Sequence, residues 1–289
     1  AWVASAVPEG LSAQALQRAM YVTVLDDRGA PVPDLGLDDF QIREDNVVRE
    51  VLRVSAANQP MHVAVLVDNS QAAEAFVRDY RLALPVFTES MLAQPAGGRH
   101  LVSIIGVADR PTIFADYTVS PTALTKGIGR IFSTTGSASY LLDGIIEVSQ
   151  GIQKRRPDRP VIVVLTTDGP ELSGRHYQTV LEPLRASGAM LHVIAVGRQR
   201  NTAQDRDLAL TIGTRETGGR YDMLLSSSAL TARLKDLAAE LTSQYLVTYG
   251  RPQTLIPPQR ITVRATRPKL VARGTPAPQP QTAIGEDPR

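Results

Sequence analysis

Short apolar runs alternate with stretches of helical periodicity through residues 59–242. Residues 62–67 and 161–165 are almost entirely aliphatic and have the length of strands, which is typical of strands buried on both faces of a parallel sheet. Between such runs, apolar residues at helical spacing predict a helix over residues 73–93. Apolar residues spaced four, three and four apart mark one face of another helix, namely Leu141, Ile145, Val148 and Ile152. This alternation predicts an α/β fold with a doubly wound, mostly parallel sheet.

The segments on either side of this block have a different pattern. Residues 20–58 and 243–274 alternate apolar and polar positions in short stretches, as half-buried strands do, and contain no helix-length pattern. One of these stretches, Val47–Val54, is predicted to be a single strand. Neither segment is large enough to form a stable core alone. We therefore expect the N-terminal and C-terminal segments to form one small discontinuous β-sandwich, which the whole α/β domain of residues 59–242 interrupts.

The two ends of the chain carry weaker signals. Residues 1–19 include Ala4-Ser5-Ala6, a small-x-small pattern that follows an apolar stretch and is typical of a signal-peptide remnant; an ordinary alanine-rich start is the alternative. Residues 275–289 contain four prolines and no periodicity, so we expect a disordered tail.

Composition and motifs exclude several kinds of site. The net charge is only +2, with no dense basic cluster, so nucleic acid is not an expected partner. The chain has no cysteine, no apolar run long enough to span a membrane, no P-loop and no Gly-x-Ser-x-Gly elbow. The four histidines are scattered and lack the spacing of a helix-borne zinc site. These absences argue against an enzyme and against a nucleotide cofactor.

Oxygen-bearing side chains gather where two of the predicted strands end. Asp68 and Ser70 directly follow the run 62–67, Asp168 follows the run 161–165, and residues 134–144 form a hydroxyl-rich loop before a helix. Ligand sites of open α/β sheets lie outside the carboxyl ends of the strands. Hydroxyl and carboxylate oxygens suit Mg²⁺ or Mn²⁺.

These motifs resemble those of the von Willebrand factor type A domain, a Rossmann-like fold. The strand followed by Asp68-Asn69-Ser70, the loop before Leu141-Leu142-Asp143-Gly144, and Leu165-Thr166-Thr167-Asp168-Gly169 carry the resemblance. Flanking motifs narrow it to the von Willebrand factor A-related proteins of Acidobacteria, which are typically exported; they include Leu37–Asp45, Glu216–Arg220, Ser243–Tyr249 and Leu270–Gly274.

The resemblance implies a metal-ion-dependent adhesion site, whose pattern is Asp-x-Ser-x-Ser, then Thr, then Asp. By position, the metal ligands would be Asp68, Ser70, Ser139 in place of the threonine, and Asp168. The second serine is replaced by Ala72, which removes one hydroxyl ligand. Water can replace that ligand at reduced affinity. The alternative is a metal-free site in which the two aspartates bind backbone groups.

Taken together, the resemblance predicts a non-catalytic, extracytoplasmic module that binds a protein partner, with Mg²⁺ or Mn²⁺ assisting through a degenerate site. One alternative is a structural scaffold or assembly subunit with a vestigial metal site. A metal-dependent hydrolase is a further alternative with less support, because no base or nucleophile is placed near the proposed metal.

Overall fold

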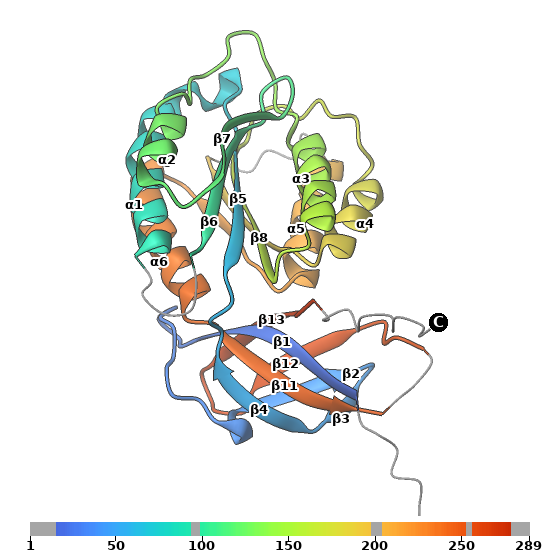
Figure 1. Cartoon of the computed structure of the whole chain (residues 1–289). Coiled ribbons are helices and arrows are strands. Elements are labelled where there is room, and N and C mark those ends of the chain that lie inside the picture. Colours follow the sequence, from blue (N-terminus) through green and yellow to red (C-terminus); the bar gives the residue numbers. More distant parts are fainter. Residues whose placement is uncertain (1–15, 94–98, 198–203, 253–255, 279–289) are drawn as a thin grey trace, which may run out of the picture.

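The protein is described by a computed structural model that covers residues 16–93, 99–197, 204–252 and 256–278. It has two parts, a helix-covered sheet and a layer of antiparallel strands beneath it (Figure 1). The large sheet has the strand order β10-β9-β8-β5-β6-β7. All neighbouring pairs in it are parallel except β6 and β7. Its strands are β5 (Met61–Val67), β6 (Leu101–Gly106), β7 (Thr112–Thr118), β8 (Arg159–Thr167), β9 (Met190–Val196) and β10 (Tyr221–Leu224).

Helices cover both faces of this sheet, as its continuous apolar strands require. Every residue of β8 and β9 is buried, because these strands lie in the interior of the sheet and helices cover both sides. One face packs against α1 (Val77–Leu92), α2 (Pro121–Ile128) and α6 (Leu230–Thr242). The other packs against α3 (Leu141–Arg155), α4 (Tyr177–Ser187) and α5 (Gln204–Glu216). This arrangement confirms the predicted doubly wound α/β fold.

The smaller part is built from both ends of the described chain. One sheet has the order β13-β1-β11-β4, and the other has the order β12-β2-β3. Their inner faces share an apolar core that includes Met20, Ile42 and Val247. The discontinuous β-sandwich is therefore present, as the sequence predicted. Its strands are β1 (Leu16–Leu25), β2 (Phe40–Glu44), β3 (Val47–Arg49), β4 (Val51–Ala56), β11 (Tyr245–Arg251), β12 (Ile261–Ala265) and β13 (Val271–Pro276).

Arg159, the first residue of β8, joins the two parts. Its guanidinium donates to the carbonyls of Ala57, Gln59 and Leu241 at 2.8, 3.0 and 3.0 Å, and to Gln244 Oε1 at 2.8 Å. The chain passes between the two parts twice, and two of the four acceptors belong to each of these connecting segments. A single buried side chain thus fixes the point where the chain enters and leaves the α/β unit.

Three details of the sequence prediction are corrected. The stretch Val47–Val54, expected as one strand, is divided between β3 and β4, which belong to different sheets. The helix expected at residues 73–93 begins as a 3-10 turn, Gln71–Phe76, before α1. Strand β13 continues to Pro276, and Ala277 N donates to Ala19 O at 2.8 Å, so the first residues of the expected tail are ordered by pairing with β1. Residues 1–15 and 279–289 lie outside the described residues.

Candidate functional site

Strand β5 places Asp68 and Ser70 at the carboxyl edge of the large sheet. The register pairs Val67 with Leu165 of β8 on one side and with Gly106 of β6 on the other, so β5 ends between two neighbours. Asp68 N donates to Leu165 O at 2.8 Å, and Ser70 N donates to Asp68 Oδ1 at 3.0 Å. Both side chains are buried. The short turn after β5 thus aims a carboxylate and a hydroxyl into the sheet edge.

The second oxygen of Asp68 is held by a residue that the ligand pattern did not single out. Thr167 Oγ1 donates to Asp68 Oδ2 at 2.8 Å and accepts from Gly169 N at 3.2 Å. The signal for this role was present, since Thr167 is the second threonine of the motif after β8. Asp68 has no salt bridge among the described residues. Its negative charge is therefore buried without a cationic side chain beside it.

Backbone hydrogen bonds bring the hydroxyl-rich loop onto this edge. Thr134 N donates to Asn69 O at 2.9 Å, and Gly136 N donates to Gln71 Oε1 at 2.9 Å. Further along, Ser139 N donates to Pro170 O at 3.0 Å and its carbonyl accepts from Leu172 N at 2.8 Å. Ser139 is fully buried as a result. The loop is thus fastened both to the turn after β5 and to the loop after β8.

Two hydroxyls at this edge have no hydrogen-bond partner among the described residues. They are Ser70 Oγ and Ser139 Oγ, and both are fully buried. A buried hydroxyl without a partner costs free energy, of the order of 1–3 kcal/mol. With the uncompensated charge of Asp68, these oxygens are what a hard divalent cation would take as ligands. The residues present therefore fit Mg²⁺ or Mn²⁺.

Asp168 lies at the same edge but its carboxylate is placed on the side of β9. A Cβ atom added to Gly197, just after β9, would lie 3.2 Å from Asp168 Oδ1. Asp168 also lines a small hollow together with Arg206 and Tyr221. The side chain is half-buried. Of the four predicted ligands, Asp68 and Ser70 contact each other directly. Ser139 is held at the same edge by hydrogen bonds of its backbone, and Asp168 is directed toward β9.

The loop that carries Asp168 is held by a cation that the sequence did not indicate. Arg206 of α5 is buried, and its Nη1 donates to Gly169 O at 2.8 Å and to Thr167 O at 3.3 Å. No local pattern marks this residue, because it lies within an ordinary helical stretch. Arg206 fixes the path of the loop and adds a positive charge behind it.

Ala72 packs directly against this loop. A Cβ atom added to Gly169 would lie 2.3 Å from Ala72 Cβ, so the glycine is required by the close approach of the two segments. Ala72 itself is only half-buried. The methyl group occupies the position where the family pattern has its second serine hydroxyl.

A further carboxyl group lies beside Ser139. Glu171 Oε2 accepts from Leu141 N, the first residue of α3, at 3.1 Å, and Oε1 accepts from Ser173 N at 3.0 Å. Burial raises the pKa of Glu171, while its hydrogen bonds act in the opposite direction. One of its oxygens caps the N-terminus of α3, where a negative charge is favourable, and the other accepts from Ser173 within the loop. We therefore assign Glu171 to the support of the loop.

Exposed apolar side chains flank the site. Phe132 and Leu172 are 61% and 58% exposed, and they belong to the two loops that carry Ser139 and Asp168. The Arg81 guanidinium lies 3.8 Å from the centre of the Phe132 ring. The edge thus combines buried oxygen ligands with an apolar rim.

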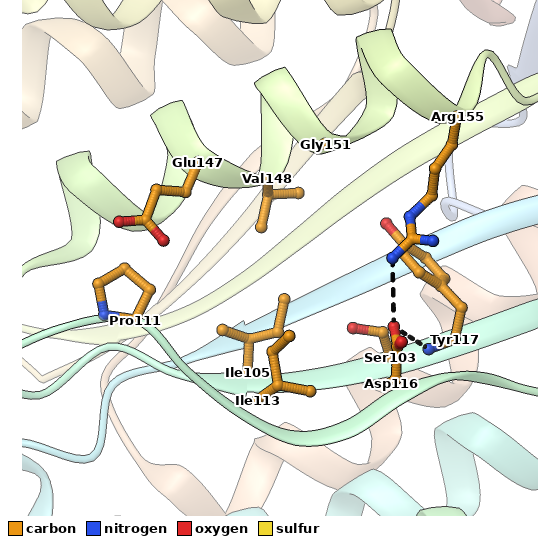
Figure 2. A pocket seen from close by; sticks show the side chains of 10 residues that line it. All are labelled: Ser103, Ile105, Pro111, Ile113, Asp116, Tyr117, Glu147, Val148, Gly151 and Arg155. Atoms are coloured by element: carbon orange, nitrogen blue, oxygen red, sulfur yellow. Dashed lines mark hydrogen bonds and ion pairs between the residues drawn. The ribbon is translucent and has the colours of Figure 1, made fainter.

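A separate pocket of about 190 Å³ lies between α3 and the β6–β7 edge (Figure 2). Arg155 lies at one end, 3.6 Å from Asp116 and 5.2 Å from the centre of the Tyr117 ring. Burial raises the pKa of Tyr117 to about 12. None of the predicted ligands lines this pocket.

Among the described residues, no group of three or more histidine, cysteine, aspartate or glutamate side chains is arranged to hold a metal. A cation at the carboxyl edge would therefore depend on the serine hydroxyls. Within the same part of the chain, no helix combines the length and the apolar character needed to cross a membrane.

No protein-family model matches the sequence, and no curated protein matches it. Solved structures do resemble the fold. The von Willebrand factor domain of the type V pili tip protein Mfa5 from Porphyromonas gingivalis has 11% identity and a TM-score of 0.50, over 64% of this chain and 96% of that one. A von Willebrand factor type A protein from Catenulispora acidiphila has 9% identity and a TM-score of 0.50, over 92% and 75%.

A third similar structure is proximal thread matrix protein 1 from the mussel byssus, with a zinc-occupied MIDAS motif. It has 15% identity and a TM-score of 0.50, and the match covers 70% of this chain and 49%, about half, of that one. At such identities the likeness shows the fold alone. The α/β unit thus has the fold of a von Willebrand factor type A domain, and the narrower resemblance to the acidobacterial proteins stays a prediction.

Proposed function

We propose that the protein is a non-catalytic interaction module that binds a protein partner at the carboxyl edge of its large sheet. Asp68, Ser70 and Ser139 hold a divalent cation there, Mg²⁺ or Mn²⁺, and Asp168 acts from the β9 side of the same edge. The bound cation supplies a positive charge at which an anionic group of the partner is attracted.

The observation that carries this proposal is the pair of buried hydroxyls without partners, Ser70 Oγ and Ser139 Oγ, at the sheet edge that also carries the buried carboxylate of Asp68. Loop contacts alone would not leave these oxygens without partners, because buried polar groups are usually hydrogen-bonded. A cation satisfies both hydroxyls and the carboxylate at once. The exposed side chains of Phe132 and Leu172 give the partner an apolar contact around the charged centre.

A binding role is supported over catalysis by where two of the four histidines lie. His100 Nδ1 accepts from Met61 N at 3.1 Å, at the opposite end of β5, and His192 is buried within β9. Neither is available as a base beside Asp68. We also propose an extracytoplasmic location, which the pilus tip and byssus proteins of similar fold support by analogy.

A scaffold with a vestigial site is the second candidate, and one observation favours it. The Ala72 methyl group fills the place of a ligand, and Asp168 is directed toward Gly197. In that case the partner would contact other faces, and the cation would have no effect on binding.

The proposal is tested by titrating Mg²⁺ and Mn²⁺ into the wild-type chain and into Asp68→Asn by calorimetry. Asp109→Asn is the matched control, because Asp109 is an exposed carboxylate just after β6 at the same edge. We expect saturable binding that Asp68→Asn abolishes and Asp109→Asn leaves unchanged.

The partner is then sought by exposing the immobilised chain to surface proteins of its source cells, with Mg²⁺ or with a chelator. Proteins captured only with Mg²⁺, and lost with Asp68→Asn, support the cation-assisted function. If the same proteins are captured with the chelator and by Asp68→Asn, the result supports the scaffold.

A further inference from the structure

A second site lies far from the carboxyl edge, in a cleft between the α/β unit and the β-sandwich. The cleft has a volume of about 400 Å³, within the range of small-molecule sites. One wall is the end of α5 and the turn before β10, and the other is formed by β12 and β13. Its lining includes Arg220, Tyr221, Ile261, Thr262, Val263 and Arg273.

The turn on the first wall is shaped by two glycines. A Cβ atom added to Gly218, which has a φ of +75°, would lie 2.2 Å from Gly274 O. One added to Gly219 would lie 1.7 Å from Leu191 O. The glycines let the turn approach β13 and β9 closely, so the cleft is a fixed part of the fold.

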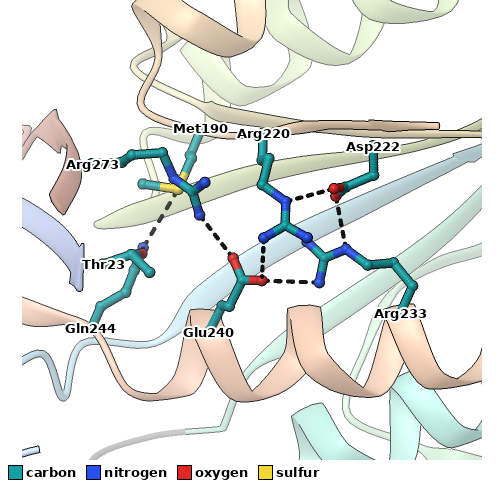
Figure 3. Close-up of polar contacts among 8 residues, drawn as sticks. All are labelled: Thr23, Met190, Arg220, Asp222, Arg233, Glu240, Gln244 and Arg273. Carbon is teal, nitrogen blue, oxygen red and sulfur yellow. Dashed lines mark hydrogen bonds and ion pairs between the residues drawn. The ribbon is translucent and has the colours of Figure 1, made fainter. Parts of the chain in front are cut away.

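Two arginines of the cleft belong to a buried ion cluster (Figure 3). Arg220 Nε donates to Asp222 Oδ1 at 2.6 Å, and Arg273 Nη2 donates to Glu240 Oε2 at 3.0 Å. Arg233 lies deeper and contacts both acids, at 2.7 and 2.9 Å. Arg220 and Arg273 keep 30% and 21% of their side-chain surface exposed, whereas Glu240 keeps 1%. The cationic groups therefore lie nearer to the cleft than Glu240 does.

The charges in this cluster do not balance. Three arginines face two carboxylates, which leaves one excess positive charge. Arg233 Nη2 and Arg273 Nε are buried donors without a hydrogen-bond partner among the described residues. Arg233 is 7% exposed. An excess of buried donors beside a net positive charge is what an anion would satisfy.

The remainder of the cleft is partly apolar. Ile261 and Val263 of β12 and Ala272 of β13 line it opposite Tyr221, and all four are half-buried. At the rim, Arg215 adds a further cation, while Glu216 is paired with Arg185 at 2.7 Å. The lining thus combines a cationic floor with an apolar wall.

We propose that this cleft binds a small organic oxyanion. Its carboxylate or phosphate group would contact Arg220 and Arg273, because guanidinium groups present paired donors that match such oxygens. Its apolar body would lie against Ile261 and Val263. Because the ligand would touch both parts of the molecule, its binding would stabilise their contact.

The test uses two organic anions, benzoate and phenyl phosphate, with the neutral benzyl alcohol and the cationic benzamidine as matched ring compounds. Calorimetry and thermal unfolding are measured on the full chain in dilute Tris buffer. We expect saturable binding of at least one anion and a Tm that rises with its concentration, because a ligand specific for the folded state stabilises it. The two anions distinguish a carboxylate from a phosphate preference.

Two substitutions locate the binding. Thr262→Asp adds a carboxylate to the lining without touching the ion cluster, and we expect it to weaken anion binding about tenfold or more, the order of one lost charge-assisted contact. Thr112→Asp makes the same change on the exposed surface of β7 and should have no effect. Arg273→Lys keeps the positive charge but removes the paired donors of the guanidinium. It should weaken the affinity for the anion by a similar factor.

The proposal is overturned if neither anion binds saturably up to millimolar concentrations, or if benzyl alcohol binds as well as the anions. It is also overturned if Thr262→Asp binds the anion as tightly as Thr112→Asp does. In these cases the arginines serve only to join the two parts of the molecule.

Discussion

At the level of single side chains, the central question is how much of the oxygen-ligand set remains. The positions of Asp68 and Ser70 could be predicted from the sequence. They directly follow an apolar strand of a parallel sheet, so they must lie at the carboxyl edge of that sheet. The direction of Asp168 could not, since it depends on Gly197 and Arg206, which are distant in the chain. Thr167 was visible in the motif, but its bond to Asp68 required the register of β5 on β8.

Restoring the lost hydroxyl should strengthen cation binding. The Ala72→Ser variant places an oxygen where the family pattern has its second serine, beside the loop that carries Gly169. We expect the Mg²⁺ dissociation constant to fall about tenfold, the order of one added contact to a charged group. Calorimetric titration of both proteins measures it. An unchanged or weaker affinity would show that position 72 does not face the cation.

A methyl group at position 169 should disturb the same contact from the other side. In Gly169→Ala, the added Cβ would lie 2.3 Å from Ala72 Cβ, which both segments must move to avoid. Such overpacking costs about 1–3 kcal/mol of unfolding free energy. Urea denaturation gives the value, and Gly151→Ala is the control, because a Cβ there meets no atom within 4 Å.

At the level of strands and helices, continuous apolar runs identified the central strands, but shorter elements were missed. Helix α2 was not predicted, although Ser120 accepts from Ala123 N at 3.3 Å and Pro121 opens the helix. Strands β3 and β4 were merged because their alternation is continuous in sequence. Only the pairing of each with a different sheet separates them at Glu50, and pairing is a long-range property.

The start of strand β5 should make stability depend on pH. Burial, and next the positive charge of Arg159, lower the pKa of His100 to about 4. The unfolded chain therefore binds more protons than the folded one between pH 6.5 and about 4, so the free energy of unfolding falls as the pH falls through this window. Burial also lowers the pKa of His62 and His192, which act in the same direction.

His100→Gln isolates this contribution, since glutamine Oε1 can still accept from Met61 N but does not titrate. We expect a shallower loss of unfolding free energy between pH 6.5 and 4 than in the wild-type chain. Parallel urea titrations across that range measure it. Identical slopes in the two proteins would mean that His100 keeps its ordinary pKa in the folded state.

At the level of the whole molecule, strand β13 of the β-sandwich and the α/β unit meet in one ion cluster. Glu240 is the shared partner of Arg220, Arg233 and Arg273, and its side chain is 1% exposed. In Glu240→Gln, three cations remain close together with one counter-charge, Asp222. Removing one partner of a buried pair typically costs about 3–5 kcal/mol.

We expect that loss in the unfolding free energy of Glu240→Gln, together with earlier unfolding of the β-sandwich. Calorimetric scans show it as a lower and broader transition. Asp236→Asn, an exposed change in the same helix, should leave the scan unaltered. A wild-type scan for Glu240→Gln would mean that Arg159 and the strand contacts alone hold the two parts together.

The central claim, a cation held by Asp68, Ser70 and Ser139, is tested most directly by crystals grown with Mn²⁺ and measured for anomalous scattering. The account predicts an anomalous peak at this edge, with Asp68 oxygen and the two serine hydroxyls at coordination distance, about 2.0–2.3 Å. Crystals of Asp68→Asn should lack the peak. Mn²⁺-containing crystals with no anomalous peak at this edge, or with the ion bound only elsewhere, would contradict it.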